Sequence, residues 1–112
     1  MVGNFYIFAF MQDINHKLPS ECTSLSEVRG EIDNIDRAII KLLGERSGYV
    51  KEVTRYKEKT AASVEAPERR MQMLCDRRRW AADAGLSPDV VEEIFDRLVR
   101  YFIEEEKKLM NI

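Results

Sequence analysis

The sequence predicts an all-α protein with one very long helix and two shorter ones, and three observations support this fold class. Apolar residues recur at the spacing of one buried helical face, prolines follow small residues at two later helix starts, and no β-hairpin or glycine-rich phosphate loop is found. At 112 residues the chain has room for one domain. Its 45% hydrophobic and 34% charged residues are typical of a soluble helical protein.

The long helix is expected from Ser24 to Ala62, a length of about 57 Å at the usual rise per residue. Its start has the capping-box pattern, with Ser24 at the N-cap and Glu27 three residues later. Gly44 and Gly48, one turn apart, indicate either a close helix crossing or room for a ligand. Two interleaved series with a seven-residue spacing form one apolar stripe: Leu25, Ile32 and Ile39, and Val28, Ile35 and Leu42.

A helix of this length cannot bury its apolar stripe against two shorter helices of the same chain. Periodic patterns that run well beyond about 25 residues usually indicate a coiled coil or a helical partner chain. We therefore expect an intertwined homodimer.

Two shorter helices follow the long one. Pro67 suits the first position of a helix, and Gly85 is the expected C-terminal cap of the same helix. Ser87 as N-cap and Pro88 at the first position then start the third helix. The apolar face expected for this third helix comprises Val91, Ile94, Phe95, Leu98, Phe102 and Leu109.

Residues 1–21 are expected to form a disordered N-terminal extension, and residues 22–112 the helical domain. The first twelve residues are apolar, but their run is too short for a membrane span of about 20 residues. They also lack the basic start and small-residue cleavage site of a secretory signal, which is the less favoured alternative. Cys22 and Cys75 lie far apart without metal-ligand spacing, which favours free thiols in a cytoplasmic protein.

The charge balance argues against a nucleic-acid partner. Eighteen basic and twenty acidic residues give a net charge of −2, whereas nucleic-acid binding requires a broad basic field. Arg77, Arg78 and Arg79 precede Trp80, but three successive arginines spread around a helix and do not line one face. We expect neither a nucleic-acid nor a membrane partner.

Cations interrupt the apolar stripe of the long helix. Arg46 occupies the next position of the first series. Lys57, eleven residues later, returns to within about 20° of the same helical line. Two inward-facing cations need an anionic partner, and arginine binds carboxylates bidentately, so a compact dianion is the expected ligand. Arg29 is rotated by about 260° from Arg46 and would serve the site of the partner protomer.

Each of these cations also has an ordinary alternative in a surface ion pair. Arg29 can pair with Asp33 or Glu31, and Lys57 can pair with Glu58 or Glu52. Arg46 is the exception, because it replaces a hydrophobic residue in an apolar series.

The string CTSLSEVRGEIDNIDRAIIKLLGERSGYVKEVTRYK, followed by a loop and APERR, resembles the AroQ-type chorismate mutases, and especially their salicylate-forming relatives, the isochorismate–pyruvate lyases. The resemblance extends from about Cys22 to Leu109. It implies a three-helix intertwined homodimer of the chorismate mutase type II fold, without cofactor or metal, that acts on a small chorismate-type dicarboxylate. The implied reaction is conversion of isochorismate to salicylate and pyruvate. Rearrangement of chorismate to prephenate is one alternative, and a non-catalytic dimerisation or regulatory module is another.

The resemblance also implies roles for individual residues. Arg29 would hold a substrate carboxylate in the site of the partner protomer, and Arg46 would bind a carboxylate in its own protomer. Lys57 would contact the ether oxygen whose bond breaks, at the edge of a mobile loop over residues 58–66. Arg69 would support the site from the end of that loop.

Two positions depart from the pattern of the chorismate mutases. Arg70 stands where those enzymes have a glutamate that binds the ring hydroxyl of the substrate; the lyases also lack this glutamate, which favours isochorismate. Glu106 aligns with a glutamine that donates a hydrogen bond to the ether oxygen. An ionised carboxylate cannot donate, so Glu106 would have to be protonated among its apolar neighbours Val99, Phe102 and Leu109, or another group takes over.

Overall fold

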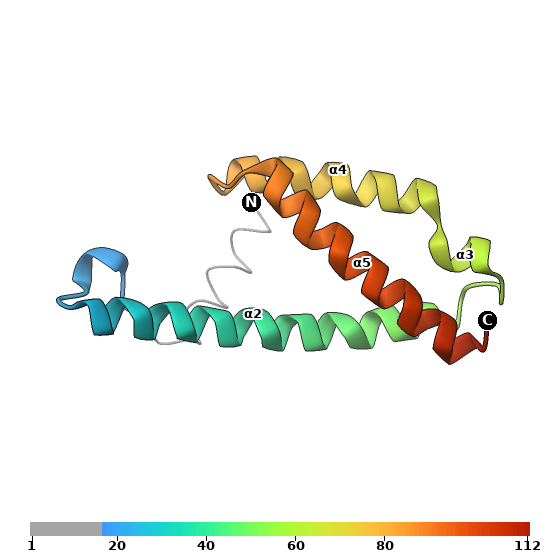
Figure 1. Cartoon of the computed structure of the whole chain (residues 1–112), viewed down its shortest axis with the longest axis horizontal. Helices are drawn as coiled ribbons and strands as arrows, with labels where there is room; N and C mark the ends of the chain where they lie inside the picture. The colour runs from blue at the N-terminus through green and yellow to red at the C-terminus, as the bar shows by residue number, and fades with distance from the viewer. Residues whose placement is uncertain (1–16) are drawn as a thin grey trace. The chain divides into compact units, whose positions relative to one another are not determined.

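The structure is a computed structural model that describes residues 17–112, and every regular element within them is helical (Figure 1). The short 3-10 helix η1 covers Pro19–Glu21, and four α-helices follow: α2 (Leu25–Val53), α3 (Ala61–Glu65), α4 (Pro67–Asp83) and α5 (Pro88–Met110). The predicted all-α class with one long and two shorter helices is confirmed, and α3 is an addition to it. Most of the expected disordered extension, residues 1–16, lies outside the described residues. The described chain divides into two compact units, one up to Arg46 and one from Ser47 onward, which are described separately.

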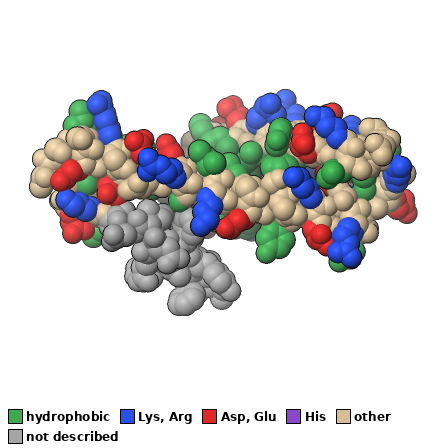
Figure 2. Space-filling model, turned by 90° about the horizontal axis from the view of Figure 1, so that it is seen from below, with side chains coloured by type: hydrophobic (Ala, Val, Ile, Leu, Met, Phe, Trp, Pro, Cys, Tyr) green, Lys and Arg blue, Asp and Glu red, His purple; other side chains and the backbone are tan. Residues whose placement is uncertain are grey.

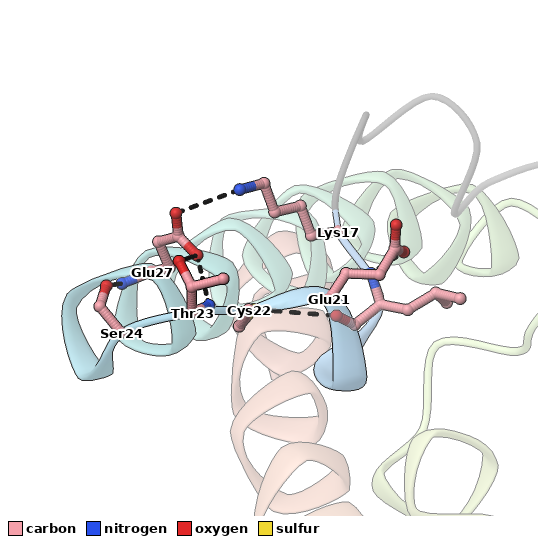
Figure 3. A network of polar contacts seen from close by, with 7 residues as sticks. Lys17, Glu21, Cys22, Thr23, Ser24 and Glu27 are labelled. Atoms are coloured by element: carbon pink, nitrogen blue, oxygen red, sulfur yellow. Dashed lines mark hydrogen bonds and ion pairs between the residues drawn. The ribbon is translucent and has the colours of Figure 1, made fainter.

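A network of polar side chains fixes the start of α2 (Figure 3). The Ser24 hydroxyl oxygen accepts a hydrogen bond from the Glu27 backbone N–H at 3.1 Å, which confirms Ser24 as the N-cap. The Glu27 carboxylate accepts bonds from the backbone N–H of Thr23 at 2.7 Å and from Lys17 at 3.1 Å. These two donors, Thr23 first, hold the pKa of Glu27 below its usual range. In a standard capping box Glu27 would accept from the backbone N–H of the N-cap residue, Ser24. Here it accepts from the N–H of Thr23, one residue earlier.

The end of α2 differs from the prediction. The helix stops at Val53 and not at Ala62, so it is about 44 Å long. The Thr54 hydroxyl donates to the Lys51 carbonyl at 2.6 Å, and the N–H groups of residues 54–56 each bond to a carbonyl three residues back. Such bonds tighten a last turn and compete with continuation of the helix. Lys57 therefore lies in the segment after α2, and the expectation that it continues the helical line of Arg46 is wrong.

The starts of the later helices follow the predicted signals. Pro67 is the first residue of α4, after Ala66 in a left-handed conformation with φ of 37°. At the other end of α4, Gly85 has φ of 76°, and the Leu86 N–H bonds to the Ala81 carbonyl at 2.8 Å, which closes a Schellman-type cap. The Ser87 hydroxyl accepts from the Val90 N–H at 3.3 Å and caps α5. The tight turn at residues 84–87 joins α4 to α5 as a helical hairpin (Figure 1).

The core of the second unit lies where α3 packs on the C-terminal half of α5. Val64 of α3 contacts a cluster that contains Ile103 and Met110, with Val99 packed against it. Phe102 of the predicted α5 face is buried, but α3, an unpredicted element, also covers Ile103 and Met110, which lie outside that face. Two members of the predicted face, Ile94 and Leu109, are exposed in the described chain.

The apolar stripe of α2 has no cover in the described part of the chain. None of the α2 residues is buried within residues 17–112. Its six stripe residues, named above, are between 40% and 63% exposed. Acidic and basic side chains are interspersed on the face shown in Figure 2, without a large patch of one sign. None of the helices within residues 17–112 is long and apolar enough to cross a membrane.

Candidate active site

The structure brings together Lys57 and Glu106, two of the residues predicted to be catalytic. The Lys57 Nζ atom lies 3.2 Å from Glu106 Oε1 and also donates a hydrogen bond to the Val64 carbonyl oxygen at 3.4 Å. Glu106 is only 4% exposed. Because a buried carboxylate is costly without a counter-charge, Lys57 compensates for the burial of Glu106.

Local structure explains why these two side chains meet. The turn after α2 places Lys57 in the segment that leads to α3, and Glu106 lies on α5 one turn after the buried Phe102. The expected mobile loop, residues 58–66, contains α3, whose N-cap Thr60 accepts a hydrogen bond from the Ser63 N–H at 3.1 Å. The segment after Lys57 thus has a defined contact with α5.

The ion pair bears on the hypothesis that Glu106 acts as a protonated donor. Lys57 supplies the positive charge that an ionised Glu106 requires. The protonated form stays a prediction. The alternative pairing of Lys57 with Glu52 does not occur, because Glu52 pairs with Arg55 at 2.5 Å.

The remaining predicted residues lie on α2 and α4. Arg29 is exposed and Arg46 is half-buried, and both belong to the first unit. Arg69 is exposed in the first turn of α4. The roles of these three arginines stay predictions.

Arg70 makes an ion pair that the sequence did not indicate. Its guanidinium Nε donates to Asp96 Oδ1 on α5 at 3.2 Å, and a second guanidinium nitrogen bonds to the same oxygen. Arg100 Nε lies 3.3 Å from the other carboxylate oxygen of Asp96. The hydrogen bond from Arg70 is the main reason that the pKa of Asp96 lies below its usual range, and Arg100 adds to it. Arg70 therefore joins α4 to α5.

An open groove of about 780 Å³ runs between α4 and α5 in the second unit. The predicted site residues do not line it. Its lysines are paired with acids, since Lys107 Nζ lies 3.0 Å from Glu65 and Lys108 Nζ lies 3.3 Å from Glu105. The bond to Glu65 raises the pKa of Lys107. Both lysines of the groove are thus engaged by acids, and none of the arginines predicted to bind the dianion lines it.

The arginine run before Trp80 does not form a basic face. The Arg77 guanidinium stacks over the Trp80 ring at 4.7 Å and over Phe95 at 5.6 Å. Arg78 lies 2.8 Å from Asp89, whereas Arg79 lies 3.0 Å from Asp76. The three side chains have three different sets of partners, as expected for successive residues on a helix.

Fold and site together define a small all-helical protein whose candidate site combines a lysine with a buried carboxylate. Residues 28–107 match the family model for chorismate mutase type II. The chain therefore belongs to the chorismate mutase type II family, and the predicted resemblance is confirmed.

Three relatives show how the family likeness is distributed. The isochorismate pyruvate lyase of Pseudomonas aeruginosa is 42% identical over 92 residues, which cover 82% of this chain and 90% of that protein. The T-protein of Haemophilus influenzae is 38% identical over 77 residues, 69% of this chain but 20% of that longer protein. The chorismate mutase of Methanocaldococcus jannaschii is 29% identical over 77 residues, 69% of this chain and 78% of that protein. The prediction that the chain belongs to a family of enzymes is confirmed.

Proposed function

We propose that this protein is an isochorismate–pyruvate lyase, which converts isochorismate to salicylate and pyruvate. The observation that carries the choice of reaction is the 42% identity to the Pseudomonas aeruginosa lyase over 90% of that protein. Arg70 also supports the lyase reaction, because this arginine stands where chorismate mutases are expected to have a glutamate. Its guanidinium group is bonded to Asp96. Rearrangement of chorismate to prephenate is the second candidate, supported by the likeness to a protein named chorismate mutase.

The proposed working unit is an intertwined homodimer in which a second copy of the chain covers the α2 stripe. Six large aliphatic residues on one face of α2 are exposed in the described chain. Full burial of one such side chain stabilises by about 1.5–3 kcal/mol, so leaving all six in water is costly. Intertwining also lets Arg29 of each protomer serve the site of the other.

In the proposed complex, arginines hold the two carboxylates of the substrate. Arg46 binds one carboxylate in its own protomer, Arg29 of the second protomer binds the other, and Arg69 supports them. A guanidinium group binds a carboxylate through two parallel hydrogen bonds, which fixes the geometry of the pair. Holding a flexible dianion in its reactive conformation removes much of the entropic part of the barrier.

The reaction needs no proton from the protein. When the ether C–O bond breaks, the hydrogen lost by the ring moves to the methylene carbon of the enolpyruvyl group. That carbon becomes the methyl group of pyruvate, and the ring becomes aromatic. Besides holding the substrate in its reactive conformation, the protein has to stabilise the negative charge that grows on the ether oxygen.

Lys57 is the group we assign to the ether oxygen. An ammonium group has three N–H donors, and the contacts of Lys57 to Glu106 and to the Val64 carbonyl use two of them. The third is then available to the substrate. A preorganised donor at a developing oxyanion is typically worth about 3 kcal/mol of transition-state stabilisation.

We propose a cytoplasmic location, in a reducing environment. Cys22 and Cys75 are free thiols in the structure, which supports this assignment.

Parallel assays with isochorismate and chorismate test the proposal. We expect salicylate, detected by its fluorescence, to form from isochorismate faster than prephenate forms from chorismate. A dominant prephenate signal would move the assignment to chorismate mutase. Absence of both products from folded dimer would favour a non-catalytic helical module.

A further inference from the structure

The short helix α3 packs on α5 through the side chains of Val64 and Glu65, the two residues joined by the carbonyl group that accepts a hydrogen bond from Lys57. Val64 is 2% exposed and packs on Ile103 and Met110. The next residue, Glu65, pairs with Lys107 of α5 at 3.0 Å. The carbonyl of Val64 itself accepts the hydrogen bond from Lys57.

We propose that α3 is a positioning element for Lys57, and that Val64 and Glu65 are positioning residues for the reaction. The inference rests on the proposed function, because it gives α3 the task of aiming the Lys57 ammonium at the ether oxygen. Val64 and Glu65 would determine the direction of the Lys57 ammonium group without touching the substrate.

The geometry of the ammonium group explains how α3 acts. One N–H is directed to the Glu106 carboxylate on α5 and another to the Val64 carbonyl on α3. Because the three N–H bonds of an ammonium group are tetrahedrally arranged, two fixed acceptors determine where the third bond points. A shift of α3 relative to α5 therefore redirects the donor that faces the substrate, and a misplacement of about 1 Å can cost up to 100-fold in rate.

Tertiary contacts must hold α3 in place because it is too short to be stable alone. Its five residues, Ala61–Glu65, are far fewer than the 12–15 or so that an isolated helix needs. Carbonyls near the end of such a helix lack intrahelical partners, which leaves that of Val64 available to Lys57. The docking of Val64 and the Glu65–Lys107 pair thus decide where this carbonyl lies.

Turnover tests the inference through a double-mutant cycle. Val64→Ala removes part of the docking side chain, and we expect kcat to fall roughly tenfold while KM changes less than about twofold. In a Lys57→Ala background the same change should alter kcat by less than about twofold, because Val64 acts through Lys57. An equal loss in both backgrounds would show a merely structural role and overturn the inference.

Glu65→Gln is the milder variant if Val64→Ala does not fold. It removes one charge of a pair at the surface, for which we expect a two- to fivefold loss of kcat. The reciprocal exchange, Glu65→Lys with Lys107→Glu, should restore kcat, and Glu93→Gln on the exposed face of α5 is the matched control that should change nothing. Failure of the exchange to restore kcat counts against the pair.

Amine labelling tests the inference without any substrate. Limited acetylation followed by mass spectrometry should modify Lys57 more slowly than the exposed Lys59 in the native protein. Val64→Ala should raise the Lys57 rate towards that of Lys59, with helix content by circular dichroism unchanged. Equal Lys57 labelling in the native protein and in the folded variant would overturn the inference. Because this result needs no turnover, it is independent of whether the proposed lyase reaction occurs.

Discussion

The N-terminal part of α2 and the α3–α5 end of the chain solve the burial of apolar side chains in different ways. Residues 25–46 carry a regular apolar stripe, yet none of α2 is buried in the described chain. The C-terminal half of α5 buries Phe102, Ile103 and Met110, and with them the carboxylate of Glu106. The region that looks most regular in sequence is therefore the one that lacks a core of its own.

The difference shows that a periodic pattern identifies an apolar face but not the surface that covers it. For α5 the cover is α3, five residues from the same chain. For α2 we have proposed a second copy of the chain. Substitutions on the α2 face should consequently act through dimerisation and depend on protein concentration, whereas substitutions on the α5 face should act within one chain.

The largest expected effect is the loss of dimer in Ile39→Glu. The substitution would replace a buried aliphatic side chain in each protomer, at about 1.5–3 kcal/mol apiece, and would place a charge in the interface. In analytical ultracentrifugation we expect a dimer for the native protein and a monomer for the variant. In the activity assay the variant should show no measurable turnover. Ile40→Glu, one residue further round the same helix, should stay dimeric. A dimer that persists in Ile39→Glu would break the comparison, since the α2 stripe would not be the interface.

The next largest effect is expected from Lys57→Ala. Loss of the donor should lower kcat by about 100-fold or more, with a smaller change in KM. It should also destabilise the fold by about 3 kcal/mol in urea unfolding, because Glu106 is left buried without its counter-charge. Adding Glu106→Gln should recover most of the stability but not the turnover. Near-native kcat in Lys57→Ala would remove Lys57 from the mechanism.

Local signals made the helix starts predictable. Ser24, Pro67 and Ser87 mark starts through bonds to groups within a few residues or through a fixed φ, and such signals can be read from the sequence. The end of α2 could not be read in this way. Val53 continues the apolar spacing and Lys57 falls in register, but the Thr54 back-bond and the docking of α3 end the helix first.

The sequence led to a set of candidate site residues but not to the contacts that those residues make. Lys57 and Glu106 were indicated by the family resemblance, yet they are 49 residues apart and nothing local shows that they meet. Arg70 and Asp96 are 26 residues apart and were missed as a pair for the same reason. Both pairs arise when the chain folds back on α5, which periodicity cannot reveal.

A smaller effect on stability is expected from Ser24→Ala, at the N-cap of α2. Ser24→Ala removes the hydroxyl that accepts from the Glu27 N–H, and losing such a cap typically costs about 1 kcal/mol. If α2 is stabilised by a partner chain, the loss should appear as weaker dimerisation and lower thermal stability at low protein concentration. Ser26→Ala, inside the first turn, is the matched control. A loss of stability that does not depend on protein concentration would show that the start of α2 does not contribute to dimerisation.

The smallest effect concerns the Arg70–Asp96 pair, which belongs to the self-contained second unit. Because Arg70 lowers the pKa of folded Asp96, the pair stabilises the fold above the unfolded pKa of about 3.9, and the stabilisation is lost as the pH falls through the lower folded pKa. A half-exposed pair of this kind contributes about 0.5–1 kcal/mol. Asp96→Asn should thus be less stable than the native protein between about pH 5 and 7, and the difference should vanish near pH 2. Urea unfolding at both ends of that range measures it. If the difference persists in acid, Asp96 contributes through packing between α4 and α5 and not through its charge.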